Sequence, residues 1–221
     1  MAQRYGATVK RFDLVNQTLK ELKNEPFSRR HIINLYQYAD LKETKGLSPC
    51  AFETIWSVRK KENNFILDLT LIQRSNDYIM AGYINKIQYV ALQMMFASHL
   101  GYEIGNFCHL TQNLHDYDRH LDALNEIKNR QPIDIQPSLI LKNKKNFKDF
   151  VLEDFEIIGT ENIKKIKFEK KTSDSALLNA QLRMIARERN LDEDKFYHET
   201  MVLLRHHTLA VLDFLEGLSN E

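Results

Sequence analysis

The sequence contains only two cysteines, Cys50 and Cys108, among its 221 residues. Two cysteines allow at most one disulfide, so the chain lacks the disulfide framework of a small secreted protein. Seven glycines and four prolines are too few for a collagen-like or linker-rich sequence. No apolar run approaches the roughly 20 residues of a membrane-spanning helix, and residues 1–12 contain no apolar signal segment. These absences predict a reduced, cytoplasmic protein with no membrane partner.

Neither sign of charge is in clear excess. Lys and Arg total 31, Asp and Glu total 30, and the formal net charge is +1. Domains that bind nucleic acid through bulk charge carry a clear basic excess, so we expect no nucleic-acid partner. A small anionic ligand is compatible with this balance, because a few local arginines are enough to bind one. Hydrophobic residues make up 43% of the chain, which is sufficient for a packed core.

Apolar periodicity predicts a mixed α/β body. Leucines alternate with polar residues over 65–72, which is typical of a strand with one buried face. Helical spacing predicts helices over 12–24 and 85–100, and Gly101 stands where a C-terminal cap belongs. We also expect strands at 32–36, 51–58, 138–142, 151–158 and 163–169, and a polar turn at 59–64.

The character of the chain changes near residue 170. Residues 170–175 have the composition of a linker with helix-start chemistry, and two amphipathic helices are predicted within 176–218. The sequence therefore predicts a nucleotide-binding or catalytic body over 1–170 and a helical extension over 171–221. We expect the extension to pack on the body or on a partner.

Four polar features could carry chemistry. Cys50 ends a Ser-Pro-Cys loop, Arg29 and Arg30 precede an apolar strand, and the remaining two are QRSND (73–77) and HDYDRH (115–120). Each has a simpler explanation when taken alone: a free cysteine is usually a small buried hydrophobe, paired arginines are usually solvated, and Ser-Asn-Asp is ordinary turn composition. The histidines in 115–120 form no HExxH or CxxC pattern, so we expect no metal site.

The order and spacing of these features are more informative than any one of them. Paired arginines, Pro-Cys, Gln-Arg-Ser-x-Asp, an Asn at a helix start and His-x-Tyr follow one another in the order of the thymidylate synthase family. The chain resembles that family from about Tyr5 to Phe168. The matching stretches are LKNEPFSRRHII, LSPC, LIQRSNDYIMAGYINKIQYVAL, LHDYDRHLD and FVLEDFEIIGTENIKKIKFE. The resemblance implies an α/β (α+β) fold with a large mixed sheet and flanking helices.

The resemblance also implies catalytic and intersubunit roles. Cys50 matches the catalytic cysteine, whose thiolate adds to C6 of the pyrimidine. Asp77 matches an aspartate near the pterin of the folate, and Asn85 matches the asparagine that binds the pyrimidine edge. Arg29 and Arg30 match paired arginines that the family supplies to the partner subunit's phosphate, so a homodimer is implied.

Further residues match the nucleotide-binding part of the family's site. Arg74 and Ser75 match residues that hold the phosphate on the active-site strand, with Gln73 beside them. His115 and Tyr117 match the pair that holds the ribose 3′-hydroxyl. The implied ligand is a pyrimidine deoxynucleotide monophosphate.

The residue types suit this chemistry. C5 of uracil is a poor nucleophile, and addition of the Cys50 thiolate at C6 turns C5 into an enolate-like carbon that can attack a one-carbon unit. The amide of Asn85 offers a donor and an acceptor, so it can pair with O4 and N3–H of uracil. An Asp, as in the family's cytidylate-specific members, would suit cytosine better. The resemblance therefore favours dUMP as substrate, with 5,10-methylenetetrahydrofolate as the one-carbon donor.

Several departures concern the folate side of the site. The resemblance begins at Tyr5, without the family's usual N-terminal third, which carries a glutamate that organises water and a tryptophan that lines the folate. The single tryptophan, Trp56, matches neither. The predicted helical extension stands where the family has a short closing tail. Ala51 replaces a histidine that usually follows the nucleophile, and residues 81–83 replace a Gly-x-Pro. We expect the nucleotide half of the site to be intact and the folate half to be altered or supplied otherwise.

Three functions remain open at this point. The first is a thymidylate synthase that converts dUMP to dTMP. The second is a pyrimidine nucleotide hydroxymethylase, which shares the covalent start but ends with water instead of hydride. The third is a nucleotide-binding relative without turnover. Cys50 argues against the third, because binding alone needs no nucleophile, whereas the missing glutamate region argues for it.

Overall fold

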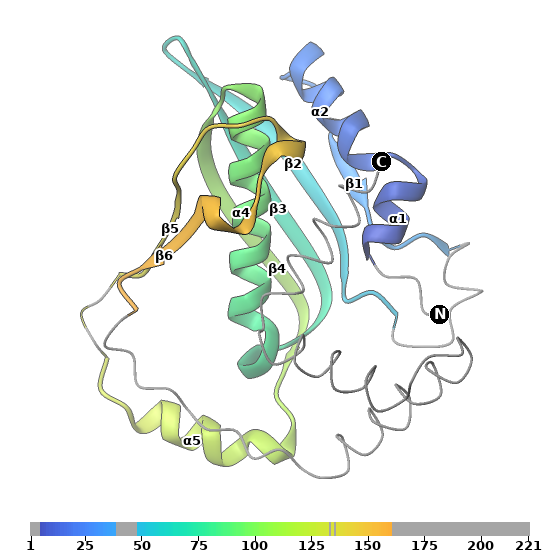
Figure 1. Ribbon diagram of the computed structural model, residues 1–221. Coiled ribbons are helices and arrows are strands. Elements are labelled where there is room, and N and C mark those ends of the chain that lie inside the picture. Colours follow the sequence, from blue (N-terminus) through green and yellow to red (C-terminus); the bar gives the residue numbers. More distant parts are fainter. Residues whose placement is uncertain (1–4, 39–47, 133, 135, 161–221) are drawn as a thin grey trace, which may run out of the picture. The chain divides into compact units, whose positions relative to one another are not determined.

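A four-stranded mixed sheet forms the centre of the described chain. The computed structural model describes residues 5–38, 48–132, 134 and 136–160. The strands lie in the order β1 (Ile32–Asn34), β2 (Ala51–Lys61), β3 (Asn64–Asp77) and β4 (Glu103–His115) (Figure 1). β1, β2 and β3 are antiparallel neighbours, whereas β4 runs parallel to β3. This mixed sheet with flanking helices confirms the expected fold class.

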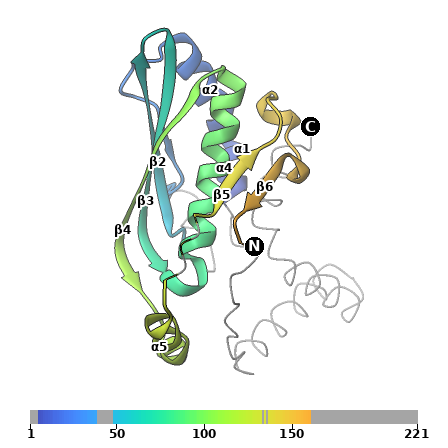
Figure 2. The ribbon, with the colours of Figure 1, turned by 90° about the vertical axis from the view of Figure 1, so that its left-hand side faces the viewer.

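Helix α4 (Tyr83–Leu100) covers one face of the sheet (Figures 1 and 2). The three leucines of the alternating strand, Leu67, Leu69 and Leu71, are buried beneath it. Trp56 of β2 stacks on Phe96 of α4, with ring centroids 4.2 Å apart and nearly parallel planes. Trp56 is therefore a core residue between the sheet and α4.

The helices predicted over 12–24 and 85–100 are present. Helix α2 (Leu14–Asn24) buries Val15, Leu19 and Leu22, as the helical spacing required. Gly101 follows α4 with φ 71°, the left-handed conformation that glycine adopts at a helix end without steric cost. Among the described helices, none is both long and apolar enough to cross a membrane.

The turn predicted at 59–64 is shorter than expected. β2 continues to Lys61 and pairs with Asn64 across a two-residue turn whose first residue, Glu62, has φ 54°. Residues 73–77, for which a turn was the simpler explanation, continue β3. Their backbone pairs with Thr111–His115 of β4, a strand that local sequence patterns did not predict. Polar side chains do not prevent pairing where a partner strand is present.

A register shift interrupts the pairing of β3 with β4 between Leu67 and Leu69. Asp68 fills it: one carboxylate oxygen accepts the N–H of Asn106 at 2.6 Å, and Arg59 donates to both oxygens. Gln93 of α4 donates to the carbonyls of Leu67 and Asn106. Side chains thus supply the hydrogen bonds that the ladder loses at this bulge.

Several elements were not foreseen. They are strand β4 (Glu103–His115) of the mixed sheet, α1 (Tyr5–Arg11), the π-helical turn η1 (Tyr78–Gly82), α5 (Leu121–Asn129) and the 3₁₀ turns η2 (Asp118–His120), η3 (Phe147–Asp149) and η4 (Leu152–Asp154). The strands expected at 138–142 and 151–158 are β5 (Ser138–Leu141) and β6 (Phe155–Ile158), which pair antiparallel. The second begins later than expected because η4 occupies its first residues. Figure 2 shows this pair on the side of α4 that faces away from the sheet. The strand expected at 163–169 and the extension at 171–221 lie outside the described residues.

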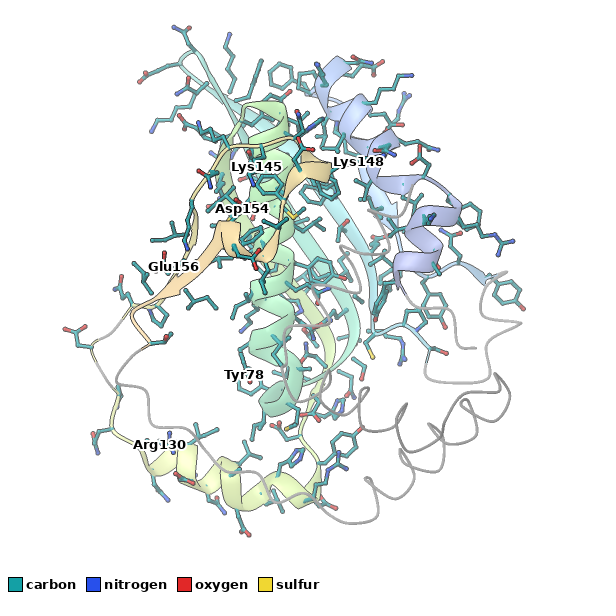
Figure 3. The ribbon with its side chains drawn as sticks, in the orientation of Figure 1. Tyr78, Arg130, Lys145, Lys148, Asp154 and Glu156 are labelled. Atoms are coloured by element: carbon teal, nitrogen blue, oxygen red, sulfur yellow. The ribbon has the colours of Figure 1, made fainter. Side chains whose placement is uncertain are left out.

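The connection between β5 and β6 is held by one buried carboxylate. Asp154 accepts hydrogen bonds from Lys145 Nζ at 2.8 Å, from the Val151 N–H and from Asn143 Nδ2. Figure 3 shows Lys145 and Asp154 on this connection in front of α4. The ammonium of Lys145 lowers the pKa of Asp154 to about 2, and the N–H of Val151 acts in the same direction.

Candidate active site

The predicted site residues converge because of the sheet's topology. The amino end of β2 and the carboxyl ends of β3 and β4 meet at one end of the sheet. Ala51, the residue after Cys50, pairs with Gln73, which in turn pairs with Thr111. Asp77 pairs with His115. Segments far apart in the sequence therefore bring Cys50, the QRSND cluster and the HDYDRH cluster to the same end of the sheet.

Cys50 is a half-buried free thiol in the loop that leads into β2. Arg74 braces this loop: its Nε donates to the Pro49 carbonyl at 2.8 Å and its Nη2 to the Ser48 carbonyl at 2.9 Å. The backbone N–H of Arg74 also donates to the Cys50 carbonyl at 2.9 Å. A guanidinium has five N–H groups, so three remain available after these two side-chain bonds.

Tyr5 contacts the loop of Cys50, which the motifs did not reveal. Its hydroxyl oxygen accepts the backbone N–H of Cys50 at 2.7 Å and that of Ala51 at 3.0 Å. Burial raises the pKa of the phenol, and the two backbone N–H groups partly offset this effect. The phenol therefore stays neutral at ordinary pH and fixes the backbone of the nucleophile. No local pattern could have indicated a contact across so many residues.

Gln73 is almost fully buried, with 2% of its surface exposed. Its Oε1 lies 2.7 Å from His109 Nε2 and accepts the amide of Asn76 at 2.5 Å. The hydroxyl of Thr111 lies 3.3 Å from the same His109 nitrogen. His109 was noted in the sequence only as a neighbour of the histidine cluster, so this contact is a finding of the structure.

His115 and Tyr117 lie together at the end of β4. Their rings meet edge to face with centroids 5.4 Å apart, and His115 Nδ1 lies 2.8 Å from the side-chain oxygen of Asn113. Because that oxygen only accepts, Nδ1 carries the proton and Nε2 is left as an acceptor. Asn113 pairs with Ser75 across the ladder, so the half-buried Ser75 lies in the same region.

Asp77 ends β3 and begins the turn toward α4. One of its carboxylate oxygens accepts the Met80 N–H at 3.2 Å, at the start of η1. Asn85 lies in the first turn of α4 and is half-buried. Tyr78, labelled in Figure 3 near the start of α4, is about half exposed, and Lys86 lies over its ring. The turn η1 therefore places Asp77 and Asn85 at the same end of the sheet.

Arg29 and Arg30 are not brought to the other residues. Both are exposed, and they precede His31, whose carbonyl accepts the N–H of Trp56. At about 3.3 Å per strand residue, this places the pair roughly 20 Å along the sheet from Cys50. Neither arginine contacts another predicted site residue within the described part of the chain.

The described residues also contain no group of three or more His, Cys, Asp or Glu that could hold a metal ion. The candidate site instead contains one thiol, one guanidinium and several amides. That donor set suits a nucleotide better than a cation.

Comparison with known proteins gives this arrangement its family. A sequence model described as "Thymidylate synthase" matches residues 1–172. The chain belongs to the thymidylate synthase family. The resemblance that the motifs indicated is confirmed.

Individual thymidylate synthases show how much of the family's length is present. The enzymes named thymidylate synthase from Streptococcus thermophilus (strain CNRZ 1066) and Streptococcus gordonii are each 45% identical over 172 residues. Those matches cover 76% of this chain and 60% and 62% of the two relatives. A solved structure, the thermostable thymidylate synthase A of Bacillus subtilis, aligns with TM-score 0.63 and 35% identity over 71% of this chain and 55% of that one. The chain thus spans about 60% of the length of the curated relatives it matches.

The departures from the family pattern have clear positions. Ala51, which stands in place of the family's histidine, is buried and uses its backbone N–H to bind Tyr5. Residues 81–83 fall at the junction of η1 and α4. The altered positions therefore border the site without interrupting the contacts among Cys50, Arg74 and Tyr5.

Proposed function

We propose that the chain binds dUMP and converts it to dTMP, with methylenetetrahydrofolate as the one-carbon donor, through a covalent bond between Cys50 and C6 of the pyrimidine. It would thus act as a thymidylate synthase-like one-carbon transferase. The observation that carries the proposal is the loop of Cys50, which Tyr5 and Arg74 hold beside the carboxyl ends of β3 and β4. A fixed nucleophile next to a partly unused guanidinium suits a phosphorylated substrate.

Arg74 and Ser75 would bind the phosphate. The three unused N–H groups of Arg74 can donate to phosphate oxygens while the other two keep the nucleophile's loop in place. The Ser75 hydroxyl has no partner among the described residues and can donate to the same anion. His115 Nε2 and the exposed Tyr117 hydroxyl would hold the ribose 3′-hydroxyl, since that nitrogen is an acceptor in the observed geometry.

Cys50 and Asn85 would act on the base. The thiolate adds to C6, and the electron pair of the C5–C6 double bond moves toward C5 and O4. C5 would then bond to the one-carbon unit and lose its proton as the bond from that unit to the folate nitrogen breaks. The exocyclic carbon would accept the hydride, and the thiolate would leave C6 as the C5–C6 double bond returns. Asn85 would pair with O4 and N3–H and so hold the ring in the orientation for attack.

The residues present can contact a folate on one side. The folate supplies the one-carbon unit and, for a methyl product, the hydride. Only one oxygen of Asp77 is engaged, so the other can accept from the N–H edge of a pterin. Tyr78, Met80 and Tyr83 expose apolar surface beside it, between 38% and 59% of each residue. This is a partial fit, and it concerns the pterin end alone.

We also propose a homodimer through the uncovered face of the sheet. Ile32, Ile55, Thr70 and Cys108 form one row across all four strands. Among the described elements, none covers this face, which Figure 2 shows on the side opposite α4. A second copy would bury the apolar row, and it would bring Arg29 and Arg30 to the phosphate of the neighbouring site. We propose a cytoplasmic location, where the two thiols remain reduced.

The product of a defined incubation tests the reaction. The purified protein is incubated with dUMP and methylenetetrahydrofolate, and the nucleotide is analysed by mass spectrometry. A methyl group that appears with wild type and with Cys108→Ala, but not with Cys50→Ala, supports the proposal. A hydroxymethyl group identifies the alternative hydroxymethylase. An unchanged nucleotide that nevertheless binds identifies a non-catalytic relative.

Mixed subunits test the shared site. Arg29→Ala and Cys50→Ala proteins are each expected to be inactive or nearly so. After random exchange, half of the dimers carry one complete site, so about a quarter of wild-type activity should return. In the control mixture, Arg59→Ala takes the place of Arg29→Ala. The guanidinium of Arg59 is engaged with Asp68. No recovery on mixing would count against shared sites.

A further inference from the structure

His109 has no role in the reaction described above, although it lies inside the site. It is half-buried on β4, and its Nε2 lies 2.7 Å from Oε1 of Gln73. Asn76 donates to the same oxygen at 2.5 Å. An amide oxygen has two acceptor positions, so these two donors fill both. A carbonyl oxygen cannot donate, and His109 must therefore carry its proton on Nε2.

This arrangement leaves the other end of the Gln73 amide open. The NH₂ group points away from the two donors and has no partner in the described part of the chain. The backbone of Gln73 pairs with that of Ala51, the residue that follows Cys50. Burial and the nearby Lys86 ammonium lower the pKa of His109 and so favour its neutral form. The hydrogen bond to Gln73 Oε1 places the single proton of that form on Nε2.

We propose that His109 is a positioning residue that locks the Gln73 amide with its NH₂ group toward the bound pyrimidine. This inference rests on the proposed function. The locked N–H groups face the place where negative charge develops on a pyrimidine carbonyl oxygen when Cys50 adds to C6. A donor already aimed at developing charge stabilises the transition state more than the ground state. A rotated amide would instead present its carbonyl oxygen to that charge.

The first test separates kcat from substrate binding. His109→Leu removes the N–H and lets the amide rotate, so kcat should fall about tenfold to a hundredfold, while the Kd of dUMP changes less than about threefold. His109→Gln restores an N–H at similar reach and should recover most of kcat. In a Gln73→Leu background, His109→Leu should have no further effect, because the group it positions is gone.

The matched control is His99→Leu at the far end of α4, which should leave kcat unchanged. The proposal is overturned if His109→Leu keeps wild-type kcat, if His109→Gln is no better than His109→Leu in a protein of unchanged melting temperature, or if the two single effects simply add.

A second measurement does not depend on turnover. Nitrogen-15 NMR of histidine-labelled protein should show His109 as the Nε2–H tautomer from pH 6 to 8. The Nδ1–H tautomer would overturn the proposal whether or not the protein is active. Absence of dUMP binding and of product in wild type would instead contradict the proposed function, and the tautomer would still decide the role of His109.

Discussion

Two stretches of the same strand, β3, differ in how many hydrogen-bonding groups of their polar side chains are used within the protein. In the middle of the strand, Asp68 uses both oxygens: Arg59 contacts each of them, and the Asn106 N–H adds a third bond. At the carboxyl end, contacts among the described residues leave three N–H groups of Arg74 and the NH₂ group of Gln73 unused. In the middle of β3 both carboxylate oxygens are used within the protein. At its end the side chains are oriented, but some of their donors are unused by the described residues.

This difference separates a structural polar cluster from a candidate site. At the bulge, the Arg59 side chain of β2 and the backbone N–H of Asn106 in β4 engage both oxygens of Asp68. At the end of β3, the contacts fix the orientation of groups whose remaining donors point elsewhere. Contacts within the protein orient the buried Gln73 amide and the exposed Arg74 guanidinium, and their remaining donors are available to a ligand.

The nucleophile provides the largest expected contrast. Cys50→Ala should lower the rate of dUMP conversion by more than about a thousandfold, because the covalent route is lost. The free energy of unfolding should change little, since the thiol is only half-buried. Rates from single-turnover assays and urea unfolding curves measure the two effects. Cys108→Ala is the matched control, and an equal loss of rate in both variants would break the comparison.

Gly105 of β4 tests the packing around Asp68 in the middle of β3. A Cβ at this position would lie 2.1 Å from Asp68 Oδ1 and 2.8 Å from the Leu67 carbonyl oxygen. Gly105→Ala should therefore destabilise the protein by about 2–3 kcal/mol, measured by urea unfolding. Gly101→Ala, where the space is open but φ is 71°, should cost about 1 kcal/mol. A smaller cost at Gly105 than at Gly101 would show that the bulge is not rigid.

Tyr5 connects stability and catalysis at the open end. Tyr5→Phe removes the acceptor for the backbone N–H groups of Cys50 and Ala51. The free energy of unfolding should fall by about 1 kcal/mol, and kcat should fall about tenfold because the nucleophile is less well placed. A stability loss with unchanged kcat would mean that the phenol supports only the fold.

Acid sensitivity is the smallest expected effect. The pKa of Asp154 is lowered to about 2 from its usual 3.8, so its contribution is present above pH 4 and is lost as the pH falls toward 2. Unfolding curves across this range should show a shallower pH dependence for Asp154→Asn than for wild type. In Lys145→Met the pH dependence should also be shallower than in wild type, because without the ammonium the folded-state pKa of Asp154 rises toward its unfolded value. Identical profiles for all three proteins would contradict this account.

Local patterns predicted the parts of the fold that depend on local physics. The alternation at 65–72, the helix at 12–24 and the cap at Gly101 follow from periodicity and backbone preference, and all three are present. The extension of β3 through 73–77 depends on pairing with β4, which no local pattern shows. Turn-forming residues therefore suggested a turn where a parallel partner maintains a strand.

The candidate site divides in the same way. Cys50 and Arg74 belong to short motifs whose order identified the family, and the structure places them in contact. Tyr5, His109 and Asn113 act through hydrogen bonds to motif residues on other elements, so only the folded arrangement reveals them. The predicted extension beyond residue 170 stays a prediction.

The most direct test of the central claim is the binding of dUMP in the absence of folate. The claim is that the described residues form a complete nucleotide half of the site. Isothermal titration calorimetry should show saturable binding of dUMP to wild type and to Cys50→Ala. Arg74→Ala should weaken it about tenfold to a hundredfold, and deoxyuridine, which lacks the phosphate, should bind far more weakly. A folded protein that shows no dUMP binding at millimolar concentration, or an Arg74→Ala variant that binds like wild type, would contradict the account.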